Sequence, residues 1–199
     1  MLNTHFFQAR HWMGLVLGLG LLATAISAPL AVQAQARSMN QTLSGDVRQL
    51  QTLLNNAFFL ELASEACATR AVDLNVVAIC TNIHSIQMQQ VANGKFALTY
   101  VTGKRPWNPT LSAADQATIT HLFFDTFASQ SDFVSAFGNA LVGKFQKSIE
   151  TAALCAGVGF APMTHHFCAT LGPVDAGQDN AIQNYLMQTI GNTAKPKSK

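Results

Sequence analysis

Charged residues are scarce in this sequence, because Asp, Glu, Lys and Arg together make up only 11% of its 199 residues, against about a quarter in an ordinary soluble domain. The polar surface must therefore come from Gln, Asn, Ser and Thr, which give little long-range electrostatic steering. The formal net charge is +2, but Arg10, Lys195, Lys197 and Lys199 lie near the two ends of the chain. Without these four residues, eight basic residues face ten acidic ones. Since no basic face is left for displacing counterions, we expect no nucleic-acid partner.

Several motifs of enzymes and metal sites are missing as well. The sequence has no G-x-S-x-G motif, no P-loop and no G-x-G-x-x-G motif after a strand. It also has no Glu-x-x-His, which a di-iron site of the ferritin-like type needs on two helices. No C-x-x-C spacing occurs, and such spacing is typical of redox pairs and of zinc sites. We therefore expect a non-enzymatic protein without a cofactor.

The one long apolar run lies at the N-terminus. Arg10 and His11 precede W-M-G-L-V-L-G-L-G-L-L-A-T-A-I-S-A, and the small residues Ala34 and Ala36 offer cleavage positions for a signal peptide. The alternative, an uncleaved anchor, fits less well, because the run stops short of the roughly 20 residues that a membrane span needs. The run contains no cysteine, which excludes a lipid-modified cleavage site. We expect residues 1–36 to be removed, and the mature protein to be exported to the periplasm or the extracellular space without a membrane span.

Apolar residues in the rest of the chain recur at three- and four-residue steps, which is the period of amphipathic helices. The pattern predicts an all-α domain over residues 46–190, after a linker at 37–45 and before a disordered basic tail at 191–199. The main stripes are Val47, Leu50, Leu54 and Phe58; Val76, Ile79, Ile83 and Ile86; Phe133, Phe137, Leu141, Phe145 and Ile149; and Ile182, Leu186 and Ile190.

Capping residues, glycine and proline set the expected ends of these helices. Residues 95–110 contain two prolines, which indicates a connector, and a shorter helix is expected after it. The result is a ferritin-like four-helix bundle of two αα-hairpins, joined by a long crossover that carries a short extra helix. The expected starts and stops are Ser44 and Asp46 for the first helix; Asp73 or Asn75 and then Asn93-Gly94 for the second; Ser112 and about Ala128 for the short helix; Ser131 for the fourth; and Pro162 for the fifth, with Gly172-Pro173 kinking or interrupting it.

Four cysteines form two couples with the same spacing. Cys67 and Cys80 are thirteen positions apart, as are Cys155 and Cys168, and both couples read C-A-x11-C around a predicted helical corner. In an exported protein an even number of cysteines indicates disulfides. Of the three possible pairings we favour Cys67 with Cys80 and Cys155 with Cys168, because a ferritin-like crossover would place the two corners at opposite ends of the bundle.

Residues 133–156, F-V-S-A-F-G-N-A-L-V-G-K-F-Q-K-S-I-E-T-A-A-L-C-A, resemble the third bundle helix of exported bacterial proteins known as the domain of unknown function 4142 family. The resemblance covers roughly residues 46–190 and implies a ferritin-like bundle. Histidines typical of that family would fall near Gln87, Phe145 and Gln178. If those histidines bind a metal, the resemblance implies that this chain has lost that site.

Four other side chains are candidate ligands for a degenerate metal site: Glu61, Glu65, His84 and Glu150. Glu61 and Glu65 are four residues apart on one helix face, and Glu150 is positioned to oppose them. Iron or another transition metal would be the cofactor of such a site.

Three further histidines are less suited to a metal. His121 and Asp125, at i and i+4, favour an ion pair over half of a metal site. His165 and His166 are adjacent, so they point about 100° apart on a helix and do not share a ligand site. We expect one of them at the surface and the other partly buried.

The first functional hypothesis is an exported, non-enzymatic helical bundle with an interaction or stress-related role and an envelope protein as its candidate partner. Two alternatives stay open. One is a metal-binding or metal-dependent redox bundle that uses the four candidate ligands. The other is a carrier that holds a small apolar molecule inside the bundle.

Overall fold

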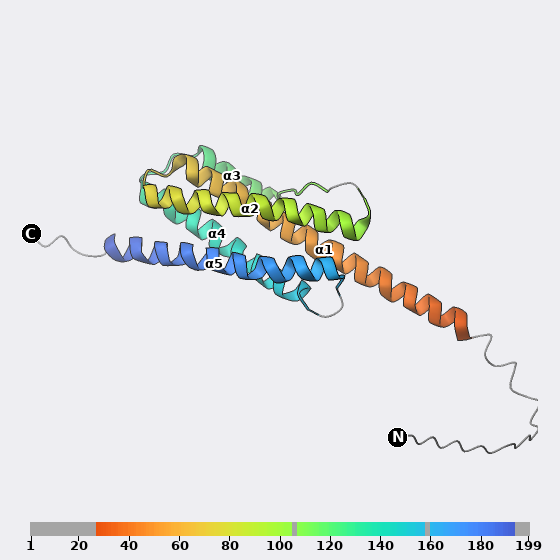
Figure 1. Ribbon diagram of the computed structural model, residues 1–199. Coiled ribbons are helices and arrows are strands. Elements are labelled where there is room, and N and C mark those ends of the chain that lie inside the picture. The colour runs from red at the N-terminus through yellow and green to blue at the C-terminus, as the bar shows by residue number, and fades with distance from the viewer. Residues whose placement is uncertain (1–26, 105–106, 158–159, 194–199) are drawn as a thin grey trace, which may run out of the picture. The chain divides into compact units, whose positions relative to one another are not determined.

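A computed structural model of the chain describes residues 27–104, 107–157 and 160–193, with side chains from residue 43 to residue 188. Every regular element in these ranges is a helix, as predicted, and the described residues contain no strand (Figure 1). The helices are α1 (Ser27–Arg70), α2 (Leu74–Thr102), α3 (Ala113–Phe124), α4 (Gln130–Cys155) and α5 (Pro162–Thr193).

The chain divides into two units, Met1–Ser38 and Met39–Lys199, and the second unit holds the bundle. Within it, α1 and α2 form one antiparallel hairpin, and α4 and α5 form another (Figure 1). Disulfides join Cys67 to Cys80 and Cys155 to Cys168, each with Cα atoms 5.8 Å apart. These are the two pairs that the spacing favours. The corners that they bridge lie at opposite ends of the bundle (Figure 1).

Two groups of buried apolar side chains form the core, one toward each disulfide. The first surrounds Cys67 and Cys80 and includes Phe59, Phe137 and Phe145. The second surrounds Cys155 and Cys168, and its other members include Leu50, Leu54, Leu98, Phe167 and Leu171. Since all four sulfurs are buried, each disulfide is part of the core as well as a crosslink between helices.

The long connection between the hairpins returns along the bundle, so that α2 and α4 run in the same direction (Figure 1). Ser112 caps α3 by accepting a hydrogen bond from the Asp115 N–H at 3.1 Å, as predicted. The short helix ends at Phe124, earlier than expected. The next helix is capped by Ser129 and not by Ser131, because the Ser129 hydroxyl accepts from the Asp132 N–H.

Arg70 ties the far end of this crossover to the first hairpin. Its guanidinium group donates to the carbonyl oxygens of Leu122 and Asp125, at 2.5 and 2.7 Å, just where α3 ends. It also lies 5.4 Å and 5.2 Å from the ring centres of Phe127 and Phe133. The unpaired carbonyls at a helix end favour a cation, and the aromatic faces add to the attraction.

Replacing Arg70 with alanine should therefore lower the free energy of unfolding by about 2 kcal/mol, because two hydrogen bonds to a charged donor are lost together with the aromatic contacts. Arg70→Lys should recover only part of the loss, since one ammonium group cannot reproduce the fork of the guanidinium. Urea unfolding at neutral pH measures both effects. An Arg70→Ala variant as stable as the parent would show that the crossover is held elsewhere.

The beginning of α1 differs from the prediction. Residues 37–45, expected to be a linker, are helical, and Asp46 does not cap its own helix. Its fully buried carboxylate instead accepts hydrogen bonds from the Ala161 N–H at 2.9 Å and the Thr164 hydroxyl at 3.1 Å. Asp46 thus serves the start of α5, a partner that lies 115 residues away in the sequence.

Changing Asp46 to alanine should destabilise the protein by about 1–3 kcal/mol, because a partly buried N–H and a buried hydroxyl at the start of α5 lose their acceptor. Protection of the amides in the first turn of α5 against hydrogen exchange should fall more than that of the amides in α3. If both helices lost protection equally, the contact would have no local role in starting α5.

A helix end expected from the sequence in the middle of α2 is absent. Asn93-Gly94 does not stop α2, which continues to Thr102 and ends at Gly103 in a left-handed conformation with φ 63°. Gly94 lies against Leu54, so that a Cβ atom there would come within 2.7 Å of that side chain. The role of Gly94 is to let two helices approach closely. Residues 95–102, expected to be part of a connector, belong to α2.

The last helix begins at Pro162, as predicted, and continues through Pro173, so of the expected kink or interruption at Gly172-Pro173 the interruption is wrong. Residues 191–193 of the expected disordered tail belong to α5, and residues 194–199 lie outside the described residues. Of the expected signal peptide, residues 1–26 also lie outside the described residues, and residues 27–36 are helical.

Candidate functional site

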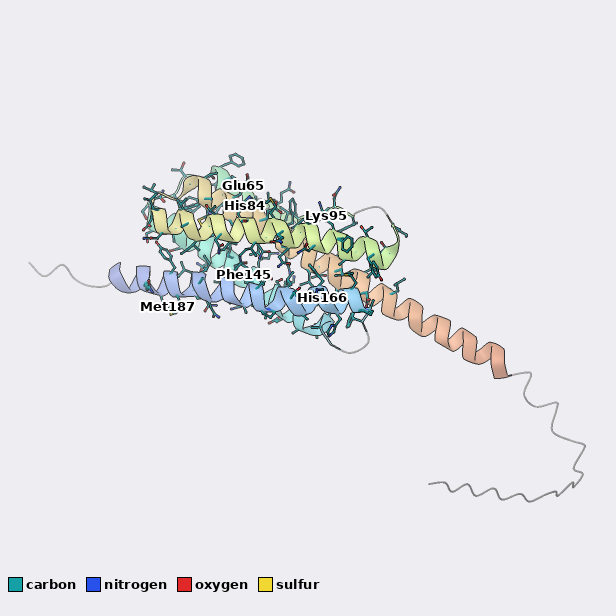
Figure 2. All side chains as sticks on the ribbon, viewed as in Figure 1. Glu65, His84, Lys95, Phe145, His166 and Met187 are labelled. Atoms are coloured by element: carbon teal, nitrogen blue, oxygen red, sulfur yellow. A yellow bond between two sulfur atoms is a disulfide. The ribbon has the colours of Figure 1, made fainter. Side chains whose placement is uncertain are left out.

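Three of the four candidate metal ligands gather between α1 and α2. Glu61 interacts electrostatically with both Glu65 and His84, and His84 Nδ1 lies 3.1 Å from the Glu61 carbonyl oxygen. Figure 2 shows Glu65 and His84 on these two neighbouring helices. Burial raises the pKa of Glu61, and the nearby Glu65 adds to the rise, while His84 and Lys95 act in the opposite direction.

Glu150, the fourth candidate, is exposed on α4. In the ranges that the structure describes, no three side chains of His, Cys, Asp or Glu come together in a way that would hold a metal ion. The gathering of Glu61, Glu65 and His84 is therefore an electrostatic cluster at the edge of the first hairpin and not a metal site.

The other histidines in the described part of the chain fall into two groups. His121 Nδ1 lies 2.6 Å from Asp125 Oδ2, in the ion pair expected from the i, i+4 spacing. His165 and His166 are both exposed, although one of them was expected to be partly buried. Phe167 and Cys168 take the buried positions that follow them in α5.

A cluster of polar side chains lies inside the bundle, where α2, α4 and α5 meet. Gln87 is fully buried, and its Nε2 donates to Asp175 Oδ1 at 2.9 Å and to Gln178 Oε1 at 2.7 Å. The hydroxyl of Ser148, also fully buried, lies close to the same carboxylate without forming a well-aligned hydrogen bond. Gln87 and Gln178 are positions to which the family resemblance assigns histidines, and the third, Phe145, is buried in the core, as its place in Figure 2 reflects.

Burial is the dominant influence on Asp175, and it raises the pKa of this carboxyl group from 3.8 to about 6. Ser148 and Gln87 lower the pKa and offset only part of the cost of desolvation. Several polar atoms of the cluster have no hydrogen-bond partner, among them Gln87 Oε1, Asp175 Oδ2 and Gln178 Nε2. A proton on Asp175 gives the carboxyl group a donor of its own and removes the buried charge.

Sequence reasoning did not single out Asp175, although a signal was present. Leu171, Asp175, Gln178 and Ile182 follow one another at three- and four-residue steps, which puts them on one face of a helix. Leu171 and Ile182 are buried. Polar residues placed between two buried apolar residues on one stripe indicate a buried polar cluster.

The exposed face of α2 is unusual for the outer face of a long helix. None of its exposed residues is charged, and Met88, Phe96 and Tyr100 are 52%, 64% and 67% exposed. These three side chains, together with the exposed Ala92, are four residues apart and therefore form one stripe. We call this stripe the α2 face. Binding surfaces of proteins are enriched in aromatic residues and Met and depleted in charge at their centre, and the α2 face has this composition.

A cavity beside the first disulfide is too small for a carried ligand. It is lined by apolar side chains such as Val76, Phe137 and Ile182, and its volume of about 10 Å³ is close to that of a single water probe. Pockets that bind small molecules have volumes of roughly 300–1,000 Å³. This part of the core gives no support to the carrier hypothesis.

Of the helices in the described part of the chain, none combines the length and the apolar character needed to cross a membrane. Comparison with known proteins gives no match: no family model fits the chain, and no curated protein or solved structure is significantly similar to it.

Proposed function

We propose that this chain is an exported, non-enzymatic binding protein of the cell envelope, and that the α2 face is the surface with which it contacts another protein. The composition of this face carries the proposal, because a helix of 29 residues has no charged residue among its exposed positions. A solvated helix face ordinarily carries charged and polar residues. An uncharged stripe that carries Met, Phe and Tyr has the composition typical of a protein interface.

Export is supported by the apolar run before Ala34 and by the two buried disulfides. Disulfides form and persist in oxidising compartments and are rare in the cytosol of most organisms. N-terminal sequencing of the protein from the cells that produce it tests the point. A mature chain that begins at Gln35 or Arg37 is the expected result, and an intact N-terminus would contradict signal cleavage.

The partner that fits this surface is a protein with an uncharged, partly apolar patch of its own. A charged partner surface would lose its hydration against the α2 face without gaining an opposite charge. Nucleic acid fits this face poorly, since its phosphates need cations and the α2 face has none. The ferritin-like arrangement that we propose for the bundle provides a rigid support, with both hairpins closed by disulfides.

Photo-crosslinking in the producing cells tests the interface. A photoreactive residue at Phe96 should give a discrete adduct with another protein. A photoreactive residue at Met187, which is 63% exposed near the C-terminal end of α5 (Figure 2), should give no such adduct. Replacing Tyr100 with serine should abolish the Phe96 adduct, because Tyr100 lies one helical turn away on the same face.

Two outcomes would contradict the proposal. One is equal adducts from Phe96 and Met187, which would show non-specific contact. The other is a Phe96 adduct with twice the mass of the protein, which would show that a second copy of this chain covers the α2 face.

A further inference from the structure

A polar cleft lies on another part of the bundle, between α1, the connector before α3, the start of α3, and α4. Its volume is about 360 Å³, and all of the side chains that line it are polar. The volume falls in the lower part of the range of roughly 300–1,000 Å³ that is usual for small-molecule sites. The cleft therefore has room for one small polar molecule.

The charges in the cleft leave one cation without a partner. Lys144 Nζ lies 2.7 Å from the Asp115 carboxylate, and this ion pair is largely shielded from solvent. Burial raises the pKa of Asp115, but hydrogen bonds from Lys144 and Ser112 and the charges of Lys144 and Lys147 outweigh it, so that the pKa is lowered. Lys147 forms no ion pair with any described residue, so the cleft has one net positive charge.

A buried side chain with an unpaired donor lines the same cleft from α1. Asn56 is only 4% exposed, it lines the cleft, and its Nδ2 has no hydrogen-bond partner. A buried amide donor without a partner costs roughly 1–3 kcal/mol. A ligand that supplies an acceptor to Asn56 would remove this cost, so the cleft favours a ligand that has an accepting oxygen close to a negative charge.

We propose that this polar cleft binds a small polyhydroxylated carboxylate, such as a sugar acid that carries one negative charge. The carboxylate takes its place between the Lys147 ammonium group and the Asn56 amide, which both donate. The ligand's hydroxyl groups face the hydroxyls of Thr110 and Ser112, which can donate or accept, and the Asp115 carboxylate, which accepts. One net positive charge in the cleft matches one carboxylate. The polar side chains that line the cleft can form hydrogen bonds with the hydroxyl groups of such a ligand, which an apolar ligand could not form. This site is separate from the α2 face and does not depend on the function proposed for it.

Calorimetric titration of the oxidised protein at low ionic strength, with glucuronate as the probe, tests the proposal. Glucose has a similar ring and no charge, and it should bind at least tenfold more weakly, because the charge-assisted hydrogen bonds are lost. Lys147→Gln should weaken glucuronate binding by about tenfold or more. Thr110→Val, at an exposed position, should weaken it about threefold through the loss of one neutral hydrogen bond. Lys95→Gln removes the same charge from α2 and should leave binding unchanged.

Several results would overturn the assignment. Absence of saturable glucuronate binding would do so, as would equal loss of binding in Lys147→Gln and Lys95→Gln. Acetate binding as tightly as glucuronate would show that the hydroxyl groups contribute nothing and that the cleft attracts anions in general. Lys147 is exposed, and thermal melting should show that Lys147→Gln folds like the parent. A failure of Thr110→Val alone to weaken binding would remove the hydroxyl contacts from the proposal.

Discussion

Replacing Cys67 and Cys80 together with alanine should lower the free energy of unfolding by about 3 kcal/mol. The disulfide closes a loop with a sequence separation of 13 residues, and the chain-entropy relation gives about this value for a loop of that length. Both sulfurs are fully buried, so alanine is preferable to serine, whose hydroxyl group would need a partner in the core. The Cys155 and Cys168 pair, with the same separation, should give a similar loss.

Urea unfolding at neutral pH measures the effect on each pair. The two losses should add, because the disulfides lie at opposite ends of the bundle and belong to different groups of core residues. A variant without all four cysteines is the matched control, since a reducing agent should destabilise the parent and leave this variant unaffected. If a reducing agent left the parent as stable as before, the disulfides would not be a source of stability.

Replacing Asp175 with asparagine should stabilise the protein at pH 8 by up to about 3 kcal/mol. The pKa of Asp175 is raised from 3.8 to about 6 in the folded protein, and each pKa unit corresponds to about 1.4 kcal/mol. Folding therefore favours the protonated form. The contribution of Asp175 to the free energy of unfolding is fully present below pH 3.8, is lost as the pH rises through 6, and stays low above that value.

Asparagine keeps the shape of the side chain without a charge. Its carbonyl oxygen can accept from Gln87 Nε2 as Asp175 Oδ1 does, and its amide group carries no charge into the core. The gain over the parent protein should therefore be small at pH 4 and largest at pH 7 to 8. Glu150→Gln removes an exposed carboxylate from α4 and should show no such pH-dependent difference.

Unfolding free energies of the parent, Asp175→Asn and Glu150→Gln between pH 4 and pH 8 decide the matter. A difference between parent and Asp175→Asn that stays constant with pH would show that Asp175 does not titrate in this range. A destabilised Asp175→Asn at pH 8 would show that the carboxylate is better paired in the core than its contacts indicate.

The features that could be predicted from sequence are those set by residues close together in the chain. Amphipathic stripes such as Phe133, Phe137 and Leu141 locate helices, because burial on one face repeats with the helical period. Ser112 and Pro162 locate helix starts, since they act through groups within three residues. The cysteine pairs were predictable for a similar reason, because each pair belongs to one hairpin.

The features that could not be predicted depend on which helices become neighbours. Asp46 has the side chain of an N-cap, but it caps a helix that begins more than 110 residues later in the chain. Gly94 has the sequence signature of a helix stop, yet its lack of a side chain serves the packing of α2 against Leu54. In both cases a local preference gives way to a tertiary contact that the sequence alone does not specify.

The same distinction applies to the candidate sites. Asp175 lies on a helical stripe that the sequence shows, but its raised pKa comes from burial against other helices, which also supply Gln87 and Ser148 to the same cluster. The polar cleft unites Asn56, Asp115 and Lys147, and these residues are far apart in the sequence. The α2 face could be identified only once the structure showed which side of α2 packs inward.

The most direct test of this account is a map of the cysteines in protein recovered from the compartment where it is produced. Free thiols are first blocked, the protein is digested without reduction, and the linked peptides are identified by mass spectrometry. We expect Cys67 to be linked to Cys80 and Cys155 to Cys168, with no thiol blocked. Blocked thiols at either pair, or a link between Cys67 and Cys155, would contradict an exported bundle whose two hairpins are each closed by a disulfide.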